Sequence, residues 1–459
     1  MEHITEIITK QDSFFTSQIT KSIGFRLGLL KKLRTELISR EEEINKALYA
    51  DFKKPAFESL ISETGVVLIE LNKVIRNLRK WARPKAVFPA MLNFPSYSKI
   101  YKDPLGKVLI IAPWNYPFQL ALAPVIGAIA AGNTVVLKPS ELASNTASLV
   151  QRIISTVFDQ SHVAVIEGGV ETSQFLLKQR WDFIFFTGSV AVGKIVAKAA
   201  AAHLTPVTLE LGGKNPCIID ETTDLKLAAK RLVWGKFLNA GQTCIAPDYF
   251  LVHSSIKSDF IAEFSKAINA TYGEDAQKSP DYPRIINTRN FDRLEKMLVG
   301  VDIVYGGKKD RDDVFIGPTL IDSPAMDSEV MKDEIFGPIS PVFSYENEAD
   351  IDRFMTHYEK PLSLYIFSKR KAFIASILEK HSFGGGCIND TLIHFVNDRL
   401  PFGGVGNSGM GAYHGKRSFD TFSHHKSITK RYSWPDLPIR YAPYKGKYKL
   451  LKSMLKIIG

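Results

Sequence analysis

Hydrophobic residues in the first eighty positions recur at helical spacing and predict three successive helices. Their inward positions are Ile19, Ile23, Leu30, Leu33 and Leu37, then Ile44 and Leu48, then Leu68, Leu71, Ile75 and Leu78. Ser39 and Glu42 have the spacing of a capping box that starts the second helix. Pro84 ends the third helix. The stretch 85–101 then reads as a loop and hairpin.

From Lys107 onward, short apolar runs alternate with helical segments. Strands are predicted at 107–112, 134–139, 163–166 and 182–186, with helices near 117–131 and from 143. A second series begins near Glu210 and includes strands at 249–253 and 361–368. Buried strands that alternate with helices indicate parallel sheets covered on both faces. The boundary between two α/β domains is expected near 209–212.

Composition indicates a globular protein that works in a reducing compartment. The chain has 459 residues, of which 45% are hydrophobic, and only three cysteines. These cysteines allow no disulfide framework and no CxxC zinc pair, so no metal is expected. The N-terminus does not resemble a signal peptide and no run has the length of a membrane span, so a cytoplasmic protein is expected.

The net charge of +11 is concentrated near the C-terminus. After Lys426, lysines and arginines face a single acidic residue, Asp436. No recognised binding motif accompanies these charges, so nucleic acid is not an expected partner.

Two segments could hold a dinucleotide. In FFTGSVAVG (185–193), Gly188, Ser189 and Gly193 stand where a strand turns into a helix, and a helix N-terminus attracts anions. The sequence is not GxGxxG, and such a turn is often plain architecture. Lys138 and Glu141 follow another strand and could meet ribose hydroxyls, or belong to a solvated loop.

Two further positions carry polar groups suited to catalysis. Glu210, in VTLELGGKNP (207–216), lies in an apolar strand, where desolvation would raise its pKa and suit a general base. An ion pair with a nearby lysine or arginine is the alternative. Asn115, in APWNYP (112–117), could donate to an oxyanion, or it could support its own turn.

The cysteines differ in their local setting. Cys244, in FLNAGQTCIAP (237–247), follows a helix in a turn of small polar residues, a setting suited to a nucleophile with donors that favour thiolate. Cys217 lies in a strand and is expected to be an inert core residue. Cys387 follows flexible glycines, and its role stays open.

These segments, in this order, resemble the aldehyde dehydrogenase superfamily over almost the whole chain. EIFGPI (334–339) and PFGGVGNSGMGAYHG (401–415) add to the resemblance. The last segment, with IHF at 393–395, is similar to the class 3 branch, which includes the fatty aldehyde dehydrogenases. Those enzymes carry a membrane anchor after this region, whereas this chain is expected to lack one.

The resemblance implies an α/β aldehyde dehydrogenase-like fold with a Rossmann-type cofactor domain, an α/β catalytic domain and a small bridging and oligomerisation element. The implied parts are a dinucleotide-binding domain at 1–84 and 102–209, a catalytic domain at 210–410, a bridging element at 85–101 and 411–435, and a basic amphipathic tail at 436–459.

The resemblance also implies roles for individual residues. Cys244 matches the nucleophile that forms a thioester, Glu210 the base that hydrolyses it, and Asn115 the oxyanion donor, which acts with the backbone N–H of Cys244. The matched cofactor residues are Lys138 and Glu141 for the adenosine ribose, Gly188, Ser189 and Gly193 for the diphosphate region, and Glu334 and Phe336 for the nicotinamide ribose and ring. Because Glu141 would repel a 2′-phosphate, NAD is the expected cofactor, with NADP as a second acceptor.

Medium- or long-chain aliphatic or aromatic aldehydes are the implied substrates, and a homodimer is the implied assembly. Three alternatives stay open: an acylating dehydrogenase that uses coenzyme A, a catalytically silent structural or lipid-surface protein, and a thiol hydrolase. Glu210, usually absent from acylating relatives, argues against the first. The intact Cys244, Glu210 and Asn115 argue against the second. No histidine stands in a recognisable motif with Cys244, which argues against the third.

The tail at 444–459 is amphipathic if it is helical. One stripe carries Lys445, Lys449, Lys452 and Lys456, and the other side carries Tyr448, Leu450, Leu451, Met454, Leu455, Ile457 and Ile458. Such a helix could pack on its own protein, cover the substrate entrance, or meet anionic lipid as a peripheral membrane contact.

Overall fold

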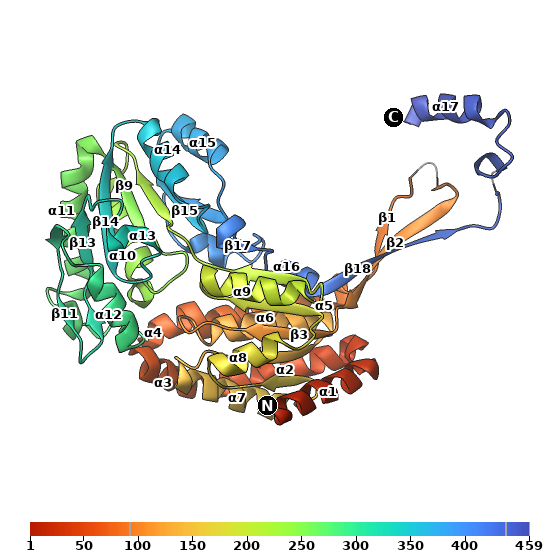
Figure 1. The fold of residues 1–459 in the computed structure, drawn as a ribbon, viewed down its shortest axis with the longest axis horizontal. Helices are drawn as coiled ribbons and strands as arrows, with labels where there is room; N and C mark the ends of the chain where they lie inside the picture. The colour runs from red at the N-terminus through yellow and green to blue at the C-terminus, as the bar shows by residue number, and fades with distance from the viewer. Residues whose placement is uncertain (91–92, 437, 459) are drawn as a thin grey trace.

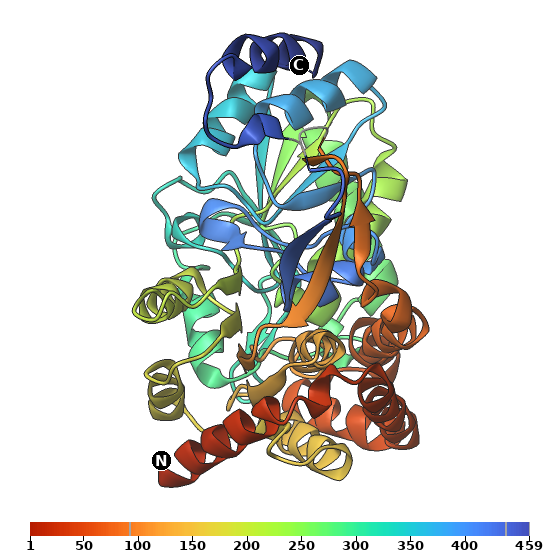
Figure 2. The ribbon, with the colours of Figure 1, turned by 90° about the vertical axis from the view of Figure 1, so that its right-hand side faces the viewer.

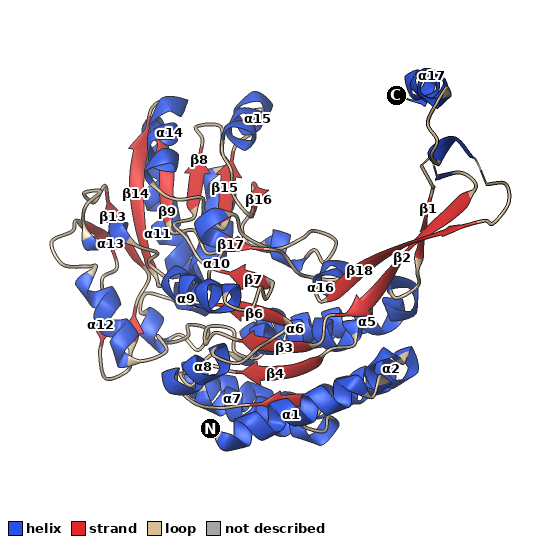
Figure 3. Ribbon diagram, turned by 45° about the vertical axis from the view of Figure 1, so that its right-hand side comes forward, coloured by secondary structure: helices blue, strands red, loops and turns tan. Residues whose placement is uncertain are grey.

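Two mainly parallel sheets, each with one antiparallel edge strand, form the body of the molecule with helices on their faces, and a β-arm projects from it (Figure 1). The computed structural model describes residues 1–90, 93–436 and 438–458. The expected α/β class is confirmed. Figure 3 shows the strands lying between layers of helices in both halves of the body.

The first sheet has the strand order β17-β7-β6-β3-β4-β5. The strands are β3 Lys107–Ile111, β4 Thr134–Lys138, β5 Val163–Val165, β6 Phe183–Thr187, β7 Val207–Glu210 and β17 Gly409–Met410. All neighbours are parallel except β17, which runs antiparallel to β7. The four apolar runs expected as strands between 107 and 186 are confirmed.

Alternate residues of this sheet face two different cores. Val108 and Ile110 of β3 pack toward one set of helices, whereas Leu109 and Ile111 pack toward the other. The helices of the first set are α2 Ile23–Ser39, α3 Glu41–Phe52, α5 Gly65–Trp81, α6 Gln119–Ala131 and α7 Ser144–Val157, and those of the second are α1 Glu2–Thr16, α8 Val170–Leu177 and α9 Val190–Ala201. Two short helical turns, α4 Ala56–Ser59 and a π turn at Leu60–Thr64, join α3 to α5.

Two details of the N-terminal helices differ from the prediction. Ile19 is exposed and precedes α2, which begins at Ile23 with Ser22 as its N-cap. The expected capping box of Ser39 and Glu42 is wrong. Ser39 is the last residue of α2 and its hydroxyl donates to the carbonyl of Glu36, so Arg40 alone separates the two helices.

The second sheet has the strand order β10-β13-β14-β9-β8-β15-β16. Its strands are β8 Pro216–Ile219, β9 Tyr249–His253, β10 Ile303–Tyr305, β13 Thr319–Asp322, β14 Ile339–Tyr345, β15 Ser363–Phe367 and β16 Gly385–Ile388. The surrounding helices are α10 Leu225–Phe237, α11 Lys257–Tyr272, α12 Thr288–Lys296, α13 Glu329–Lys332, α14 Glu348–His357 and α15 Lys371–Lys380, and a small ribbon joins β11 Lys309–Asp310 to β12 Phe315–Ile316. The chain passes from the first sheet to the second between Glu210 and Pro216. The domain limits proposed from the sequence stay predictions.

The arm consists of β1 Lys85–Val87, β2 Ser96–Pro104 and β18 Ser423–Arg431 (Figures 1 and 2). The hairpin expected at 85–101 is present, and β18 pairs antiparallel with the whole of β2. Helix α16 Lys416–Thr421 joins the body to β18, and helix α17 Lys447–Ile458 lies beyond the far end of the arm, apart from the body. Within the described ranges, no helix is long and apolar enough to cross a membrane.

Candidate active site

Cys244 lies on a loop whose path is set by close backbone packing. After α10, the turn Leu238–Gly241 places Asn239, Ala240 and Gly241 at positive φ. A Cβ on Gly241 would lie 2.4 Å from the carbonyl oxygen of Gly337, so only glycine fits there. The turn therefore packs directly on the segment that follows Glu334. Cys244 itself is half-buried.

Side chains from neighbouring segments hold the backbone of this loop. The Asn215 amide donates to the carbonyl oxygens of Cys244 (2.7 Å) and Ala246 (3.1 Å). The Tyr365 hydroxyl donates to the carbonyl of Ile245 at 2.6 Å. Asn215 directly precedes β8 and Tyr365 lies in β15, so the loop is fixed against two neighbouring strands of the second sheet.

Asn115 follows β3 and joins the same loop. Its Nδ2 donates to the carbonyl of Gln242 at 3.1 Å, and its own carbonyl accepts from Nδ2 of Asn239 at 2.8 Å. The neighbouring Tyr116 hydroxyl lies 2.6 Å from Oγ1 of Thr243. A side-chain amide carries two N–H groups, so Asn115 keeps one for a further acceptor.

A buried ion pair lies behind Asn115. Nζ of Lys54 lies 2.7 Å from Oε1 of Glu63, and both side chains have no exposed surface. The same Nζ donates to the Asn115 carbonyl at 3.4 Å and lies 4.5 Å from the centre of the Tyr116 ring. The sequence alone does not mark this pair, because a lysine and a glutamate nine residues apart resemble any solvated pair.

Glu210 ends β7 as a buried carboxylate. It is 3% exposed, and neither carboxylate oxygen has a hydrogen-bond partner among the described residues. Burial raises its pKa well above the ordinary value. The alternative drawn from the sequence, an ion pair, is therefore wrong for the part of the chain that the structure describes.

The Cys244 thiol lies beside two carboxylates. Burial raises its pKa, the charges of Glu334 and Glu210 raise it further, and the N–H groups of Cys244 and Ile245 act in the opposite direction. The thiolate-favouring setting expected from the sequence is therefore outweighed in the free protein. Packing places the three groups in one site, because Glu334 rests on Gly212, two residues after Glu210, and the turn before Cys244 rests on Gly337, three residues after Glu334.

Glu334 and Phe336 approach this site from the second sheet. A Cβ on Gly212 would lie 1.9 Å from Oε2 of Glu334, so the carboxylate rests on a bare glycine. Its Oε1 has no hydrogen-bond partner among the described residues, and burial, aided by Asp248, raises its pKa to about 8. The Phe336 ring packs edge-on against the Trp114 ring, with 5.3 Å between the two ring centres.

The turn between β6 and α9 has the expected form. The Ser189 hydroxyl is the N-cap of α9 and accepts from the amide of Val192. A Cβ on Gly193 would lie 2.7 Å from the Leu211 side chain, so glycine allows the helix to pack closely on the sheet. Gly188 donates its N–H to the carbonyl of residue 210, which links this turn to the end of β7.

Lys138 and Glu141 lie at the carboxyl end of β4. Lys138 is 3% exposed and forms an ion pair with the exposed Glu141, so the solvated-loop alternative is wrong for Lys138. With the N-terminus of α9 and the nearby Glu334, whose Oε1 has no partner among the described residues, this edge of the first sheet fits a dinucleotide. Among the described residues, no cluster of three or more His, Cys, Asp or Glu could hold a metal ion.

The fold and site together define a class: a dinucleotide-dependent oxidoreductase. Comparison with protein families agrees, because the model of the aldehyde dehydrogenase family matches residues 2–428. The chain belongs to the aldehyde dehydrogenase family. It is an NAD(P)-dependent enzyme that oxidises aldehydes.

Relatives of similar length support this assignment. The chain is 48% identical over 446 residues to the 4,4'-diaponeurosporen-aldehyde dehydrogenase of Staphylococcus aureus, covering 97% of each chain. It is 43% identical over 449 residues to the dimeric NADP-preferring aldehyde dehydrogenase of Canis lupus familiaris, covering 97% of this chain and 99% of the relative. It is also 46% identical over 412 residues to aldehyde dehydrogenase family 3 member A2 of Pongo abelii, covering 90% and 85%.

Solved structures agree on the fold. Substrate-bound AldH of Staphylococcus aureus superposes with a TM-score of 0.97 at 47% identity, covering 98% of this chain and 99% of that one. The NADP complex of glyceraldehyde-3-phosphate dehydrogenase from Methanocaldococcus jannaschii gives 0.83 at 26% identity, covering 94% of each.

Proposed function

We propose that Cys244, Glu210 and Asn115 carry out the oxidation of apolar aldehydes to carboxylic acids through a thioester on Cys244. The observation that supports this most directly is the set of groups around the Cys244 loop. They are the thiol, the Glu210 carboxylate, which has no hydrogen-bond partner among the described residues, and the second N–H of the Asn115 amide. Three segments far apart in the chain supply these groups. They have the chemical types that acyl chemistry at a carbonyl requires.

In the first step, the Cys244 sulfur forms a bond to the aldehyde carbon and its proton passes to the Glu210 carboxylate. A raised pKa makes Glu210 a stronger base for this transfer. The free N–H of Asn115 and the backbone N–H of Cys244 donate to the developing oxyanion. A nicotinamide, when bound, supplies the acceptor for the hydride that leaves this carbon. The carbonyl then reforms as a thioester.

In the second step, Glu210, once deprotonated, takes a proton from water. The water oxygen bonds to the thioester carbon, the C–S bond breaks, and the acid leaves. Both oxygens of Glu210 lack partners in the described protein, so no competing group must be displaced. The presence of this carboxylate favours hydrolysis over transfer to coenzyme A.

Pre-steady-state kinetics with hexanal and NAD test this assignment. We expect Cys244→Ser to abolish NADH formation, and Glu210→Gln to leave at most one equivalent per site followed by a stall. Cys217→Ser serves as the matched control, because Cys217 is buried in β8. Turnover by Cys244→Ser at the parent rate, or release of the product only when coenzyme A is added, would contradict the proposal.

For the cofactor, we propose NAD as the preferred acceptor and NADP as a second one. The negative charge of Glu141 disfavours a 2′-phosphate, while its ion pair with Lys138 offsets part of that charge. A relative named as NADP-preferring agrees with dual use. The ratio of kcat/KM for the two cofactors measures the preference, and a strong preference for NADP would overturn it.

For the substrate, we propose medium- or long-chain aliphatic and aromatic aldehydes. The buried aromatic ring of Tyr116 beside Asn115 supports an apolar entrance. The relative named for 4,4'-diaponeurosporen-aldehyde agrees. A length series of aliphatic aldehydes should show kcat/KM rising from three-carbon to longer chains, and a flat series would contradict this.

For the assembly, we propose a homodimer formed through the arm. Exposed aromatic residues gather near its end, with Phe88 99% and Trp434 83% exposed, and a relative is named as dimeric. Such exposed apolar surface is typical of an interaction site. Size-exclusion chromatography with light scattering should give twice the chain mass, and deletion of 86–95 should yield a monomer.

Helix α17 is a candidate for two contacts: the substrate entrance, or an anionic membrane surface. Its basic stripe and apolar side both lie outside the body of this chain. Truncation after Pro443 distinguishes the contact with the substrate entrance from the contact with a membrane. Loss of co-sedimentation with anionic vesicles supports the lipid contact, whereas a changed chain-length preference with unaltered vesicle binding supports the entrance.

A further inference from the structure

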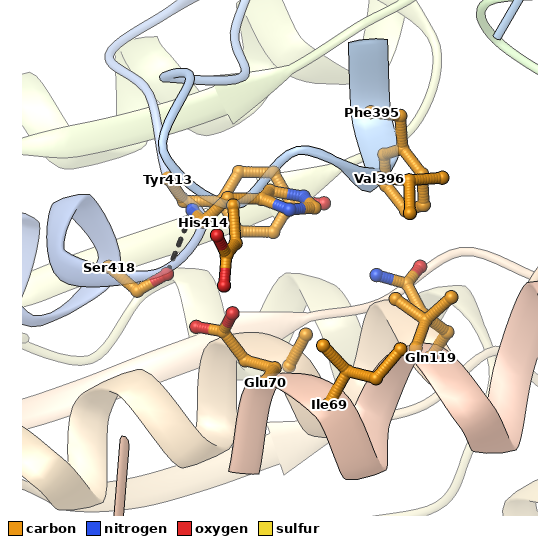
Figure 4. A pocket seen from close by; sticks show the side chains of 11 residues that line it. Ile69, Glu70, Gln119, Phe395, Val396, Tyr413, His414 and Ser418 are labelled. Carbon is orange, nitrogen blue, oxygen red and sulfur yellow. Dashed lines mark hydrogen bonds between the residues drawn. The ribbon is translucent and has the colours of Figure 1, made fainter. Parts of the chain in front are cut away.

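A small cavity lies on the side of the site where α5 and α6 meet the C-terminal loop. Its volume of about 30 Å³ is room for one or two water molecules. Its apolar walls are formed by Val66, Ile69, Ala123, Phe395 and Val396. Figure 4 shows Glu70, Gln119, Tyr413 and His414 facing the same space.

Several polar atoms that line this cavity have no hydrogen-bond partner in the described part of the chain. Nε2 of Gln119, the hydroxyl of Tyr413 and Nε2 of His414 are buried without a hydrogen bond among the described residues. Buried polar groups in folded proteins are normally satisfied. A cavity of this size with polar groups around it therefore suits ordered water.

Tyr413 lines this cavity and lies three residues after β17, the strand that pairs with the strand of Glu210. Its loop follows β17, whose Gly409 pairs with Glu210 in the first sheet. Burial raises the pKa of Tyr413 well above 10, and the charges of Glu210, Cys244 and Glu70 raise it further, whereas the nearby Gln119 side chain acts in the opposite direction. The hydroxyl therefore lies within electrostatic reach of Glu210 on one side and Glu70 on the other.

Glu70, on α5, is a buried carboxylate without an assigned role. It is 6% exposed and accepts from the amide of Gly415 at 3.0 and 3.1 Å. Burial raises its pKa to about 7, and the nearby Asp398 raises it too, whereas Gly415, Lys73 and Ser418 act in the opposite direction. The facing imidazole of His414 is buried and neutral, with its pKa lowered to about 3 by burial.

A route to the surface begins on the outer side of Glu70. Asp398 and His414 line both the cavity and an open groove of about 730 Å³. Lys73 forms an ion pair with Asp398 at the border between them. The groove is also lined by Arg399, Lys416, Arg417 and Asp420.

We propose that Tyr413 and Glu70, with water in the cavity between them, form the exit route for the protons that Glu210 collects. This inference rests on the proposed role of Glu210 as the base. Aldehyde oxidation releases protons, and a carboxylate enclosed by protein must lose one before it can act again.

Each proton transfer in this route is balanced, because every group that accepts a proton also gives one up. The Glu210 carboxylic acid gives its proton to the Tyr413 oxygen through a water, while the Tyr413 O–H gives its own proton to cavity water. Cavity water passes a proton to the Glu70 carboxylate, which releases it to the groove. Tyr413 ends neutral and Glu210 ends ionised. No oxidant or further reactant is needed.

Stopped-flow NADH formation tests the route, because only steps after the first proton transfer depend on it. In Tyr413→Phe and Glu70→Gln we expect the first equivalent of NADH at a rate within twofold of the parent and a steady-state rate reduced at least tenfold. Glu70→Gln keeps an oxygen for the Gly415 amide. The matched control is Tyr345→Phe, which removes another buried, unpartnered hydroxyl from the second sheet.

The pH profile gives a second readout that a structural role would not change. The parent steady-state rate should rise through about pH 7 as Glu70 ionises, and Glu70→Gln should remove that rise. A small buffer acid such as imidazole should partly restore the rate of Tyr413→Phe. NAD binding and thermal unfolding show whether each variant folds, and Gln119→Leu tests the same cavity if Tyr413→Phe does not.

Three results would overturn the inference: a burst and a steady state slowed equally, behaviour identical to Tyr345→Phe, or variants whose aldehyde KM depends on chain length differently from that of the parent. The last would assign the cavity to the substrate tail. Failure of the proposed function would be detected separately, by the kinetics of the Glu210→Gln variant.

Discussion

The contact between Gly212 and Glu334 provides a sharp test of the cofactor site. In Gly212→Ala, the new Cβ would lie 1.9 Å from Oε2 and 2.5 Å from the carboxyl carbon of Glu334. The opposing atoms belong to the end of a flexible side chain, and Gly212 is not at positive φ. The protein should therefore fold, with the Glu334 carboxylate displaced.

The size of the effect follows from this displacement. Ordinary contact begins at 3.4 Å, so Oε2 must move by 3.4 − 1.9 = 1.5 Å. A shift of that size breaks a hydrogen bond, and bonds to charged groups contribute about 1.5–3 kcal/mol. If Glu334 holds the nicotinamide ribose, kcat/KM for NAD should fall roughly 10- to 150-fold.

The neighbouring Gly213→Ala variant is the matched control. Its Cβ would meet Pro361 at 3.3 Å, a contact that requires a shift of only about 0.1 Å. Steady-state kinetics with NAD as the varied substrate, beside thermal unfolding of both variants, give the comparison. The reasoning is refuted if Gly212→Ala uses NAD within twofold of the parent, or if Gly213→Ala is equally impaired.

Three further predictions concern the catalytic loop. Asn115→Ala removes an oxyanion donor and should lower kcat about 100- to 1000-fold with NAD binding unchanged; a loss below fivefold contradicts the assignment. Lys54→Met leaves Glu63 buried without its partner and should lower the unfolding free energy by about 3–5 kcal/mol in urea titration, whereas Lys46→Met, at an exposed ion pair, should change nothing measurable. Because the pKa of Cys244 is raised, its alkylation by iodoacetamide in the free enzyme, followed by mass spectrometry of its peptide, should accelerate about tenfold per pH unit from pH 7 to 9. A plateau below pH 8 would show that the thiol is already ionised.

Features that depend on local pattern were predictable from the sequence. The strands around 107–111 and 134–138 follow from apolar runs between helical segments, since burial on both faces demands them. The turn at Gly188 was predictable because a glycine between a strand and a helix has a local signature. The N-terminal helices were also expected, but Ser39 was misassigned because the packing of α2 extended the helix through it.

The ionisation and support of the site were decided by tertiary structure alone. Cys244 was selected from its turn, but its raised pKa arises from burial and from carboxylates 34 residues before it and 90 residues after it. The Lys54–Glu63 pair and the Glu70 cavity have no sequence signature, because desolvation depends on which distant segments enclose a group. The sequence by itself determined which chemical groups the protein carries and in which local elements they lie. Only the folded chain decided which of them are removed from water and placed against one another, since electrostatic effects depend on distance and burial in space.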